Sequence, residues 1–423
     1  MRKKSKFILY IIVFLCVLKL SQIFQTSVET KDKRVPGQDC QEKTNIVFIK
    51  ILKCAGTTLT GILRRFGYVR DLQLVLPVRK QLYLNYPTPK LTKNIYRWST
   101  RKPNMLIDHA VLAEQDMAEL MPGNTVYISC IRHPFAQLRS SYAFFSKFGL
   151  SRFTGIPDTS FNPVNEYVSE LDKYEQAYQM NKARINKCHP DGFSIHRNIM
   201  SHFLGMPLGF PAGTANISGD VEAIQRYIQH LDDKFTFIMI TEYFIESLIM
   251  LRRLMCWTFK DIVFINQNVI QYKDKFDPIP DHILKTHQRW SNADYMLYEY
   301  FNSSLWRRIN NEGVEDFFDE VKTFKRVQNQ VTNYCAALFQ MRDPNRIPPY
   351  LNETKFGQTR WNAPFSILPK DCSYLQNPYP LLFKMQDESS ARDPQLTHQQ
   401  EKSLQAEERA ALGKKVACSK AVP

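Results

Sequence analysis

The feature that most constrains the fold is a repeated alternation of short apolar segments with longer segments of helical spacing. The short segments are rich in β-branched and aromatic residues, which is typical of strands covered on both faces of a parallel sheet. The longer segments place apolar residues three and four positions apart, as in amphipathic helices. This order predicts an α/β fold with a parallel sheet flanked by helices. The predicted strands cover residues 45–50, 104–108, 125–130, 235–240 and 261–266, and the predicted helices cover residues 57–66, 112–120, 136–148, 220–231, 243–257, 291–310 and 315–334.

The chain is long enough for one enlarged α/β domain with additional segments. Its 423 residues are 44 % hydrophobic and 23 % charged, which excludes a disordered chain, a collagen-like fibre and a protein with many membrane spans. The alternating part predicts a domain over residues 44–340. Residues 341–385 are rich in Pro and aromatic side chains and predict an irregular wrap over that domain. Residues 386–423 are almost without large apolar side chains, which predicts a polar tail, disordered or loosely helical.

The N-terminus has the pattern of a membrane signal. Residues 1–6 carry four Lys and Arg side chains and precede an apolar segment over residues 7–24. A membrane-spanning helix needs about 17 residues or more. We therefore predict a cytosolic tail, a transmembrane signal anchor and a polar stem over residues 25–43, with the rest of the chain in the lumen. Such a short span suits the thin membranes of the early secretory pathway. A cleaved signal peptide is the alternative.

Cysteines, sequons and charge fit that compartment. The chain has nine cysteines and no C-x-x-C pair, so disulfide bonds are the natural use for several of them. Glycosylation sequons occur at Asn216, Asn302 and Asn352. The sequence shows no cluster with metal-ligand spacing, so no metal requirement is predicted. With lumenal placement, the net charge of +15 favours an anionic ligand or lipid surface over nucleic acid.

The loop after the first predicted strand has the features of an anion-binding turn. Small residues precede the next helix, so backbone N–H groups and the positive end of the helix dipole would face a bound anion. Lys53 adds a positive charge, and Thr57 and Thr58 add hydroxyl donors. The spacing is not that of a Walker A loop, because the lysine precedes the small residues. A loop with a merely solvated lysine is the alternative when this segment is taken alone.

A second basic segment follows the third predicted strand. Arg132 is expected at the carboxyl edge of the sheet, where open α/β folds bind their ligands. Pro134 begins a helix, and Ser140 lies about two turns along it. Arg makes forked contacts with phosphate oxygens, and Ser can add a further hydrogen bond. A surface Arg and a helical Ser without a ligand are the alternative for this segment alone.

Together, the two segments resemble the paired signature of sulfotransferases. The pattern K-x-x-x-T-T runs from Lys53 to Thr58, and R-x-P-x-x-x-x-x-S runs from Arg132 to Ser140. The likeness is closest to the Golgi galactose-3-O-sulfotransferase family, which includes cerebroside sulfotransferase. It extends in order over about residues 40–335. The resemblance implies a P-loop-like sulfotransferase fold and 3′-phosphoadenosine 5′-phosphosulfate as the donor substrate.

The resemblance also implies roles for individual residues. Lys53 would neutralise the bridging oxygen of the departing nucleotide, and Arg132 and Ser140 would hold its 3′-phosphate. Arg197 and Asn198 would contact the acceptor sugar. The 5′-phosphosulfate would lie on the strand-to-helix loop, whose members are Lys53, Cys54, Ala55, Gly56, Thr57 and Thr58.

The proton acceptor is the point at which this sequence departs from the family pattern. The family has a histidine immediately before the loop lysine, and this chain has Leu52 there. His109 follows the second predicted strand and matches a second histidine of the family. A histidine at that edge can take a hydroxyl proton near neutral pH, so we predict His109 as the catalytic base. A histidine that caps a helix, or is simply buried and hydrogen-bonded, is the alternative.

These features predict a Golgi, single-pass type II membrane enzyme with a lumenal catalytic domain. By resemblance, it transfers a sulfuryl group to the 3-OH of a terminal β-galactose on a glycolipid or glycoprotein. A galactose-terminated acceptor is thus the expected partner, and the oligomeric state is left open. A glycosyltransferase is disfavoured because the chain has no D-x-D motif. The remaining alternative is an inactive sulfotransferase-like protein that binds glycans, which the substitution at Leu52 keeps open.

Overall fold

The computed structural model describes residues 40–78, 83–146, 154–156, 162–185, 191–210, 213–265, 279–341, 347–376 and 378–412. The chain divides into two compact units, Met1–Gln41 and Glu42–Pro423, and every element below belongs to the second. The predicted cytosolic tail, the signal anchor and most of the stem lie outside the described residues. Among the residues that are described, no helix is both long and apolar enough to cross a membrane.

A parallel sheet forms the centre of the second unit, as the sequence predicts. Its order is β2 (Met105–Leu106), β1 (Ile46–Ile49), β3 (Val126–Ile131) and β4 (Phe237–Ile240). Every neighbouring pair is parallel, so all four strands end at one edge. Nearly all strand residues are buried, which explains the unbroken apolar runs in the sequence. The predicted parallel sheet flanked by helices is confirmed.

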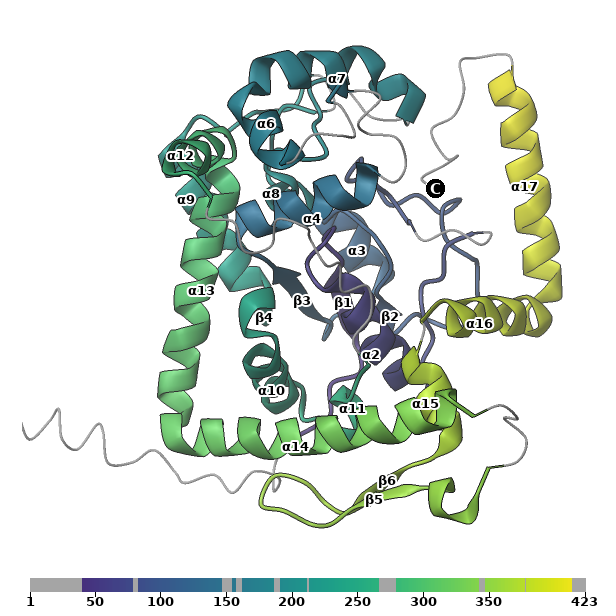
Figure 1. The fold of residues 1–423 in the computed structure, drawn as a ribbon. Coiled ribbons are helices and arrows are strands. Elements are labelled where there is room, and N and C mark those ends of the chain that lie inside the picture. Colours follow the sequence, from purple (N-terminus) through teal and green to yellow (C-terminus); the bar gives the residue numbers. More distant parts are fainter. Residues whose placement is uncertain are drawn as a thin grey trace, which may run out of the picture. The chain divides into compact units, whose positions relative to one another are not determined.

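Helices flank this sheet. In Figure 1, α10 and α13 lie beside β4, and α2 lies beside β1 and β2. All seven predicted helices are present, most with ends within a few residues of the prediction. The helices up to residue 339, with the three-residue 3₁₀ turn η1, are α2 (Gly56–Val69), α3 (Glu114–Leu120), α4 (Pro134–Ser146), α6 (Pro163–Ser169), α7 (Leu171–Ile185), α8 (Ile199–Phe203), α9 (Val221–Lys234), η1 (Thr241–Tyr243), α10 (Phe244–Met255), α11 (Phe259–Ile262), α12 (Asp281–Trp290), α13 (Asn292–Glu312) and α14 (Val314–Phe339).

The prediction of a fifth strand over residues 261–266 is wrong for the residues that are described. The segment begins inside α11 (Phe259–Ile262), and a capping box stabilises the N-terminus of this helix. The backbone of Phe264 then donates to and accepts from the side chain of Gln328 on α14. A buried backbone needs hydrogen-bond partners, and this side chain supplies them where a neighbouring strand was expected. The apolar run is therefore core packing without a strand.

The C-terminal part is more regular than the sequence predicts. The expected irregular wrap contains an antiparallel hairpin and a helix that a disulfide between Cys335 and Cys372 ties to α14. Residues 386–412, part of the expected polar tail, form the end of one helix and the whole of another. The elements of this part are η2 (Pro349–Leu351), β5 (Thr354–Phe356), β6 (Phe365–Ile367), α15 (Pro369–Gln376), α16 (Pro378–Arg392) and α17 (Pro394–Leu412).

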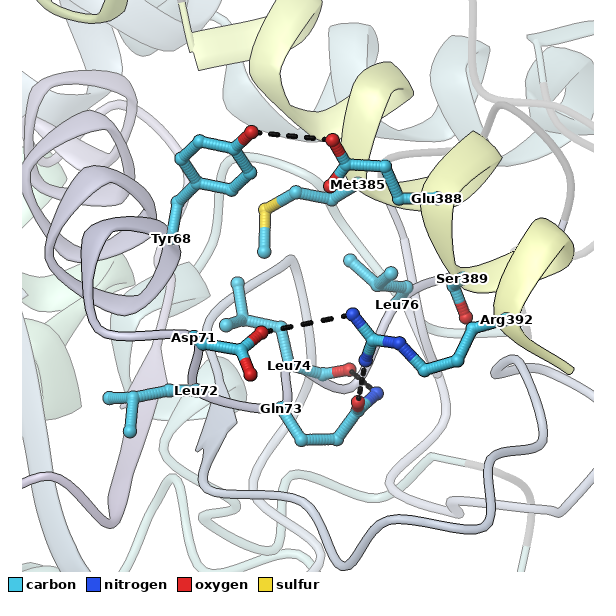
Figure 2. Close-up of a pocket in the computed structure, with 10 residues that line it drawn as sticks. All are labelled: Tyr68, Asp71, Leu72, Gln73, Leu74, Leu76, Met385, Glu388, Ser389 and Arg392. Atoms are coloured by element: carbon cyan, nitrogen blue, oxygen red, sulfur yellow. Dashed lines mark hydrogen bonds and ion pairs between the residues drawn. The ribbon is translucent and has the colours of Figure 1, made fainter.

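Polar contacts explain why α16 is ordered despite its composition. Figure 2 shows its side chains facing the end of α2 and the chain that follows. Glu388 accepts from the Tyr68 hydroxyl at 3.3 Å, and the Arg392 guanidinium lies 3.8 Å from the Asp71 carboxylate. Arg392 also donates to Gln73 at 3.3 Å, beside a cavity of about 50 Å³. Leu381, Leu382 and Met385 bury the first half of α16 in the core, and these polar contacts hold its second half, where large apolar side chains are lacking.

Buried charges join α10 to α14. Glu320 is fully buried and accepts from Arg252 and Arg253, each at 2.7 Å from guanidinium Nε. Both arginines belong to the last turn of α10, where positive charge also complements the helix dipole. Removing one partner of such a cluster leaves charge buried without compensation.

We expect Glu320→Gln to lower the free energy of unfolding by about 3 kcal/mol, because the buried Arg252 guanidinium loses its carboxylate, whereas the half-buried Arg253 keeps Glu312 and Asp316 as partners. Denaturant unfolding measures the change. Glu222→Gln is the matched control, since Glu222 pairs with Arg226 at 3.6 Å on the exposed face of α9. The control should change stability by under about 1 kcal/mol. Equal losses for the two variants would show that the buried cluster is not what joins the helices.

Candidate active site

The loop between β1 and α2 has an unusual backbone. Lys53 and Ala55 both have left-handed conformations, with φ of 62° and 55°. Such conformations are costly for residues other than glycine and tend to persist at functional sites. Ala55 is the N-cap of α2, and this helix starts with no side-chain cap and no acidic residue in its first turn. The first N–H groups of α2 are therefore available to an external anion, as the sequence predicts.

Arg132 lies against this loop. It follows β3 directly, and its Nη1 donates to the Lys53 carbonyl oxygen at 3.4 Å. This is the one hydrogen bond that its side chain makes within the described part of the chain, so most of its N–H groups remain available. Its Nε lies 3.9 Å from Oε1 of Glu242, which also accepts from the His133 backbone N–H at 3.0 Å. Glu242 follows β4, so three strand ends meet here.

Helix α4 supports both segments. The Lys53 ammonium lies over the ring of Phe144, 4.1 Å from its centroid. Gln137 donates to the Leu52 carbonyl at 3.2 Å, which holds the backbone of the loop. Ser140 is buried on the same helix. The two motifs that the sequence pairs are thus joined physically through α4.

Cys54 lies inside this loop as a buried free thiol. Burial raises its pKa well above the usual value, and its Sγ contacts the Leu52 carbonyl at 3.5 Å. The thiol is therefore protonated and unreactive at neutral pH. Its contribution to anion binding would come from the backbone N–H.

His109 lies at the same sheet edge, just beyond β2. Its Nδ1 donates to the Lys50 carbonyl oxygen at 3.0 Å, because a carbonyl can only accept. The ring stacks on Tyr83 with centroids 4.7 Å apart. Burial, followed by the positive charges of Lys50 and Lys53, lowers its pKa well below 6.5. The imidazole is therefore neutral, with its proton on Nδ1 and a lone pair on Nε2.

The two residues predicted to contact the acceptor have different surroundings. Asn198 is buried in a left-handed conformation as the N-cap of α8, and its Oδ1 accepts from the Asp294 N–H at 3.3 Å. Arg197 is exposed, and its Nε donates to the Trp290 carbonyl at 2.9 Å. Acceptor contact by either residue stays a prediction.

Asp294 holds the start of α8 rather than facing a ligand. Its carboxylate accepts from the backbone N–H of Met200 and from both the N–H and the hydroxyl of Ser201, at 2.7–3.2 Å. Burial raises its pKa to about 6 against these hydrogen bonds. The carboxylate therefore stabilises the segment that carries the predicted acceptor residues.

The three sequons differ in exposure. Asn216 and Asn352 are exposed, and Asn302 is half-buried on α13. Their glycosylation stays a prediction. In the part of the chain that the structure describes, no group of three or more His, Cys, Asp or Glu side chains could hold a metal ion.

Sequence reasoning missed two neighbours of His109. Tyr83 lies in a segment without periodic pattern, so nothing in the sequence indicated it. Lys50 could have been noticed, because a charged residue at the end of a buried strand is unusual and needs a reason.

A profile for the family described as galactose-3-O-sulfotransferase matches residues 4–347 of the chain. The chain belongs to the galactose-3-O-sulfotransferase family. Galactose-3-O-sulfotransferase 3 from Mus musculus is 25 % identical over 69 % of this chain and 63 % of its own length. Galactosylceramide sulfotransferase from Homo sapiens is 26 % identical over 70 % of this chain and 65 % of its own length. Galactose-3-O-sulfotransferase 2 from Homo sapiens is 26 % identical over 83 % of this chain and 84 % of its own length. The family predicted from the two motifs is confirmed, although the chain spans less than two thirds of the length of the first two relatives.

Two buried histidines lie near the arginine segment of this family member. His196 is 3 % exposed, and neither ring nitrogen has a hydrogen-bond partner within the described residues. His287 bonds the Tyr295 hydroxyl at 3.0 Å through Nδ1. Burial lowers the pKa of each to about 3. In the unfolded chain both take up protons below about pH 6.5, so each contributes stability at neutral pH that is lost as the pH falls.

We expect His196→Phe to make folding less sensitive to acid. At pH 5 the protonation of His196 in the unfolded state lowers the free energy of unfolding by about 2 kcal/mol. Phenylalanine takes up no proton, so the variant does not lose this stability. The stability of the variant relative to the wild type should therefore rise by that amount between pH 7 and pH 5, as measured by urea unfolding. Replacement of the exposed His282, which is not part of the core, is the control. A constant difference between His196→Phe and the wild type at both pH values would refute the assignment.

Proposed function

We propose that this protein is a sulfotransferase that uses 3′-phosphoadenosine 5′-phosphosulfate and modifies a galactose hydroxyl. The observation that supports this most is the contact between Arg132 and the Lys53 carbonyl, which brings two anion-binding segments 79 residues apart to one sheet edge. A donor with phosphate groups at both ends of its ribose needs two such segments within reach of each other. Family membership supports the same reaction class.

The residues present fit the donor. The uncapped start of α2, with the hydroxyl groups of Thr57 and Thr58, suits the 5′-phosphosulfate. The available N–H groups of Arg132 suit the 3′-phosphate, with Ser140 behind it on α4. Lys53 would leave the ring of Phe144 to neutralise the bridging oxygen of the leaving nucleotide. That exchange is inexpensive, because a cation–π contact is worth about 0.5–2 kcal/mol.

His109 is suited to accept the acceptor's proton. The Nδ1 hydrogen bond to the Lys50 carbonyl fixes the tautomer and leaves the Nε2 lone pair to the site. The hydroxyl oxygen of the sugar would bond to sulfur as the sulfur–oxygen bond to the nucleotide breaks. The proton would pass to Nε2, and adenosine 3′,5′-bisphosphate would leave. The low pKa makes His109 a weak but always available base across neutral pH.

The acceptor and compartment follow from the relatives and the N-terminal pattern. The relatives' names specify galactose 3-O-sulfation and, in one case, galactosylceramide as acceptor. For this chain we propose the 3-OH of a terminal β-galactose on a glycolipid or glycoprotein. The basic and apolar N-terminus supports a type II anchor in the Golgi with the second unit in the lumen.

The decisive experiment incubates the purified protein with sulfur-labelled donor and a panel of galactosides. Transfer to galactose-terminated acceptors is expected, with loss of transfer when the 3-OH is replaced by hydrogen. Binding of galactosides without any transfer would instead support the inactive, glycan-binding alternative, which the apolar Leu52 at the family's histidine position keeps in view.

We expect Lys53→Ala to lower kcat/KM by about a hundred- to thousandfold, because the charge that develops on the leaving group loses its cation. His109→Ala should lower kcat by about a hundredfold or more while the affinity for adenosine 3′,5′-bisphosphate is retained. Lys260→Ala, at a partly exposed lysine of α11, is the control. Near-normal turnover of either site variant would show that its role is assigned wrongly.

A further inference from the structure

Lys50 is a buried lysine to which the proposed reaction gives no role. It follows β1 and is 3 % exposed. Its side chain passes along the start of α2: a Cβ added at Gly56 would lie 3.0 Å from its Cγ and 3.3 Å from its Cε. Gly56 thus leaves the space that the lysine side chain occupies beside the first residue of α2. The ammonium makes no hydrogen bond with the residues that the structure describes.

The charges around Lys50 do not balance. Arg64 on α2 and Asp108 after β2 form an ion pair at 2.5 Å, and both side chains are 1 % exposed. Arg64 therefore already compensates the carboxylate nearest to Lys50. Protonated Lys50 gives this buried group one net positive charge. An uncompensated buried charge is costly unless a ligand of opposite sign joins it.

We propose that Lys50 is a second cation of the donor site, which pairs with the 5′-phosphosulfate from beneath the start of α2. This inference rests on the proposed sulfotransferase function. Lys53 approaches the same anion from the loop, so the phosphosulfate would lie between two lysines and the N–H groups of α2. Lys50 also acts on the base, because its charge contributes to the lowered pKa of His109 while its carbonyl fixes the tautomer.

The pKa of Lys50 makes donor binding dependent on pH. Burial lowers it to about 8, against the attraction of Asp108 and together with the repulsion of Arg64. The neutral imidazole of His109, which is bonded to the Lys50 carbonyl, adds no charge. An anion bound beside the ammonium would raise the pKa of Lys50 again. At pH values at which Lys50 is partly neutral, anion binding therefore takes up a proton. Affinity should therefore fall as the pH rises through about 8.

The test measures binding of adenosine 3′,5′-bisphosphate to the full-length protein by titration calorimetry at pH 6.5, 8 and 9. Buffers of different ionisation enthalpy report the protons exchanged. For the wild type we expect an uptake of about half a proton at pH 8 and close to none at pH 6.5. Affinity should fall about tenfold between pH 7 and pH 9.

Three variants give the matched comparison. Lys50→Met should weaken binding about ten- to hundredfold at pH 7 and take up no proton, because the ammonium that would bond to the 5′-phosphate is gone. Lys50→Arg keeps a charge that does not titrate, so it should bind without the loss at alkaline pH. Lys325→Met, at an exposed lysine of α14, should behave as the wild type.

The pH profile of kcat for Lys50→Met separates an electrostatic role from a structural one. Loss of the neighbouring charge should raise the pKa of His109, so the acid limb of the profile moves to higher pH. If the wild type binds no adenosine bisphosphate at all, the proposed function fails. If the wild type binds it without proton uptake at pH 8, and Lys50→Met binds equally well, only the role of Lys50 is refuted.

Discussion

The parallel register of β1 with its two neighbours decides where every proposed site residue lies. Because Ile49 pairs with Ser129 and Val47 with Leu106, the chains that leave these strands emerge at one edge of the sheet. The first forms the loop with Lys53, the second carries His109, and the third carries Arg132. Each side chain is therefore placed by a rigid, buried strand, which is the support that a precise anion site needs.

The positive charges of the site are complementary to a ligand of high negative charge. Lys50, Lys53 and Arg132 lie around the β1–α2 loop, and α2 starts with neither a side-chain cap nor an acidic residue in its first turn. The nearby carboxylates of Asp108 and Glu242 are each engaged by an arginine. Burial, helped by the charges of Lys50 and Lys53, lowers the pKa of His109 and holds its imidazole neutral. Two of the charges that would attract the donor thus also affect the base.

Strands, most helices and the two anion-binding segments could be predicted, because they are encoded by local patterns and spacing. The path of Lys50 could not, since it depends on a missing Cβ at Gly56 and on an ion pair between Arg64 and Asp108. The false strand after residue 261 has the composition of a true one. Side chains from distant segments satisfy its backbone in place of a strand partner: Gln328 bonds Phe264, and Arg65 donates to the carbonyl oxygens of Asp261 and Val263. The helices after residue 386 likewise depend on polar contacts with distant segments, which no local pattern reveals.

A crystal or electron-microscopy structure of the protein with adenosine 3′,5′-bisphosphate tests the central claim most directly. The account predicts the 5′-phosphate on the first N–H groups of α2, within reach of Lys50 and Lys53, and the 3′-phosphate on Arg132. A nucleotide bound away from this edge of the sheet, or one with its two phosphates in the opposite order, would contradict it.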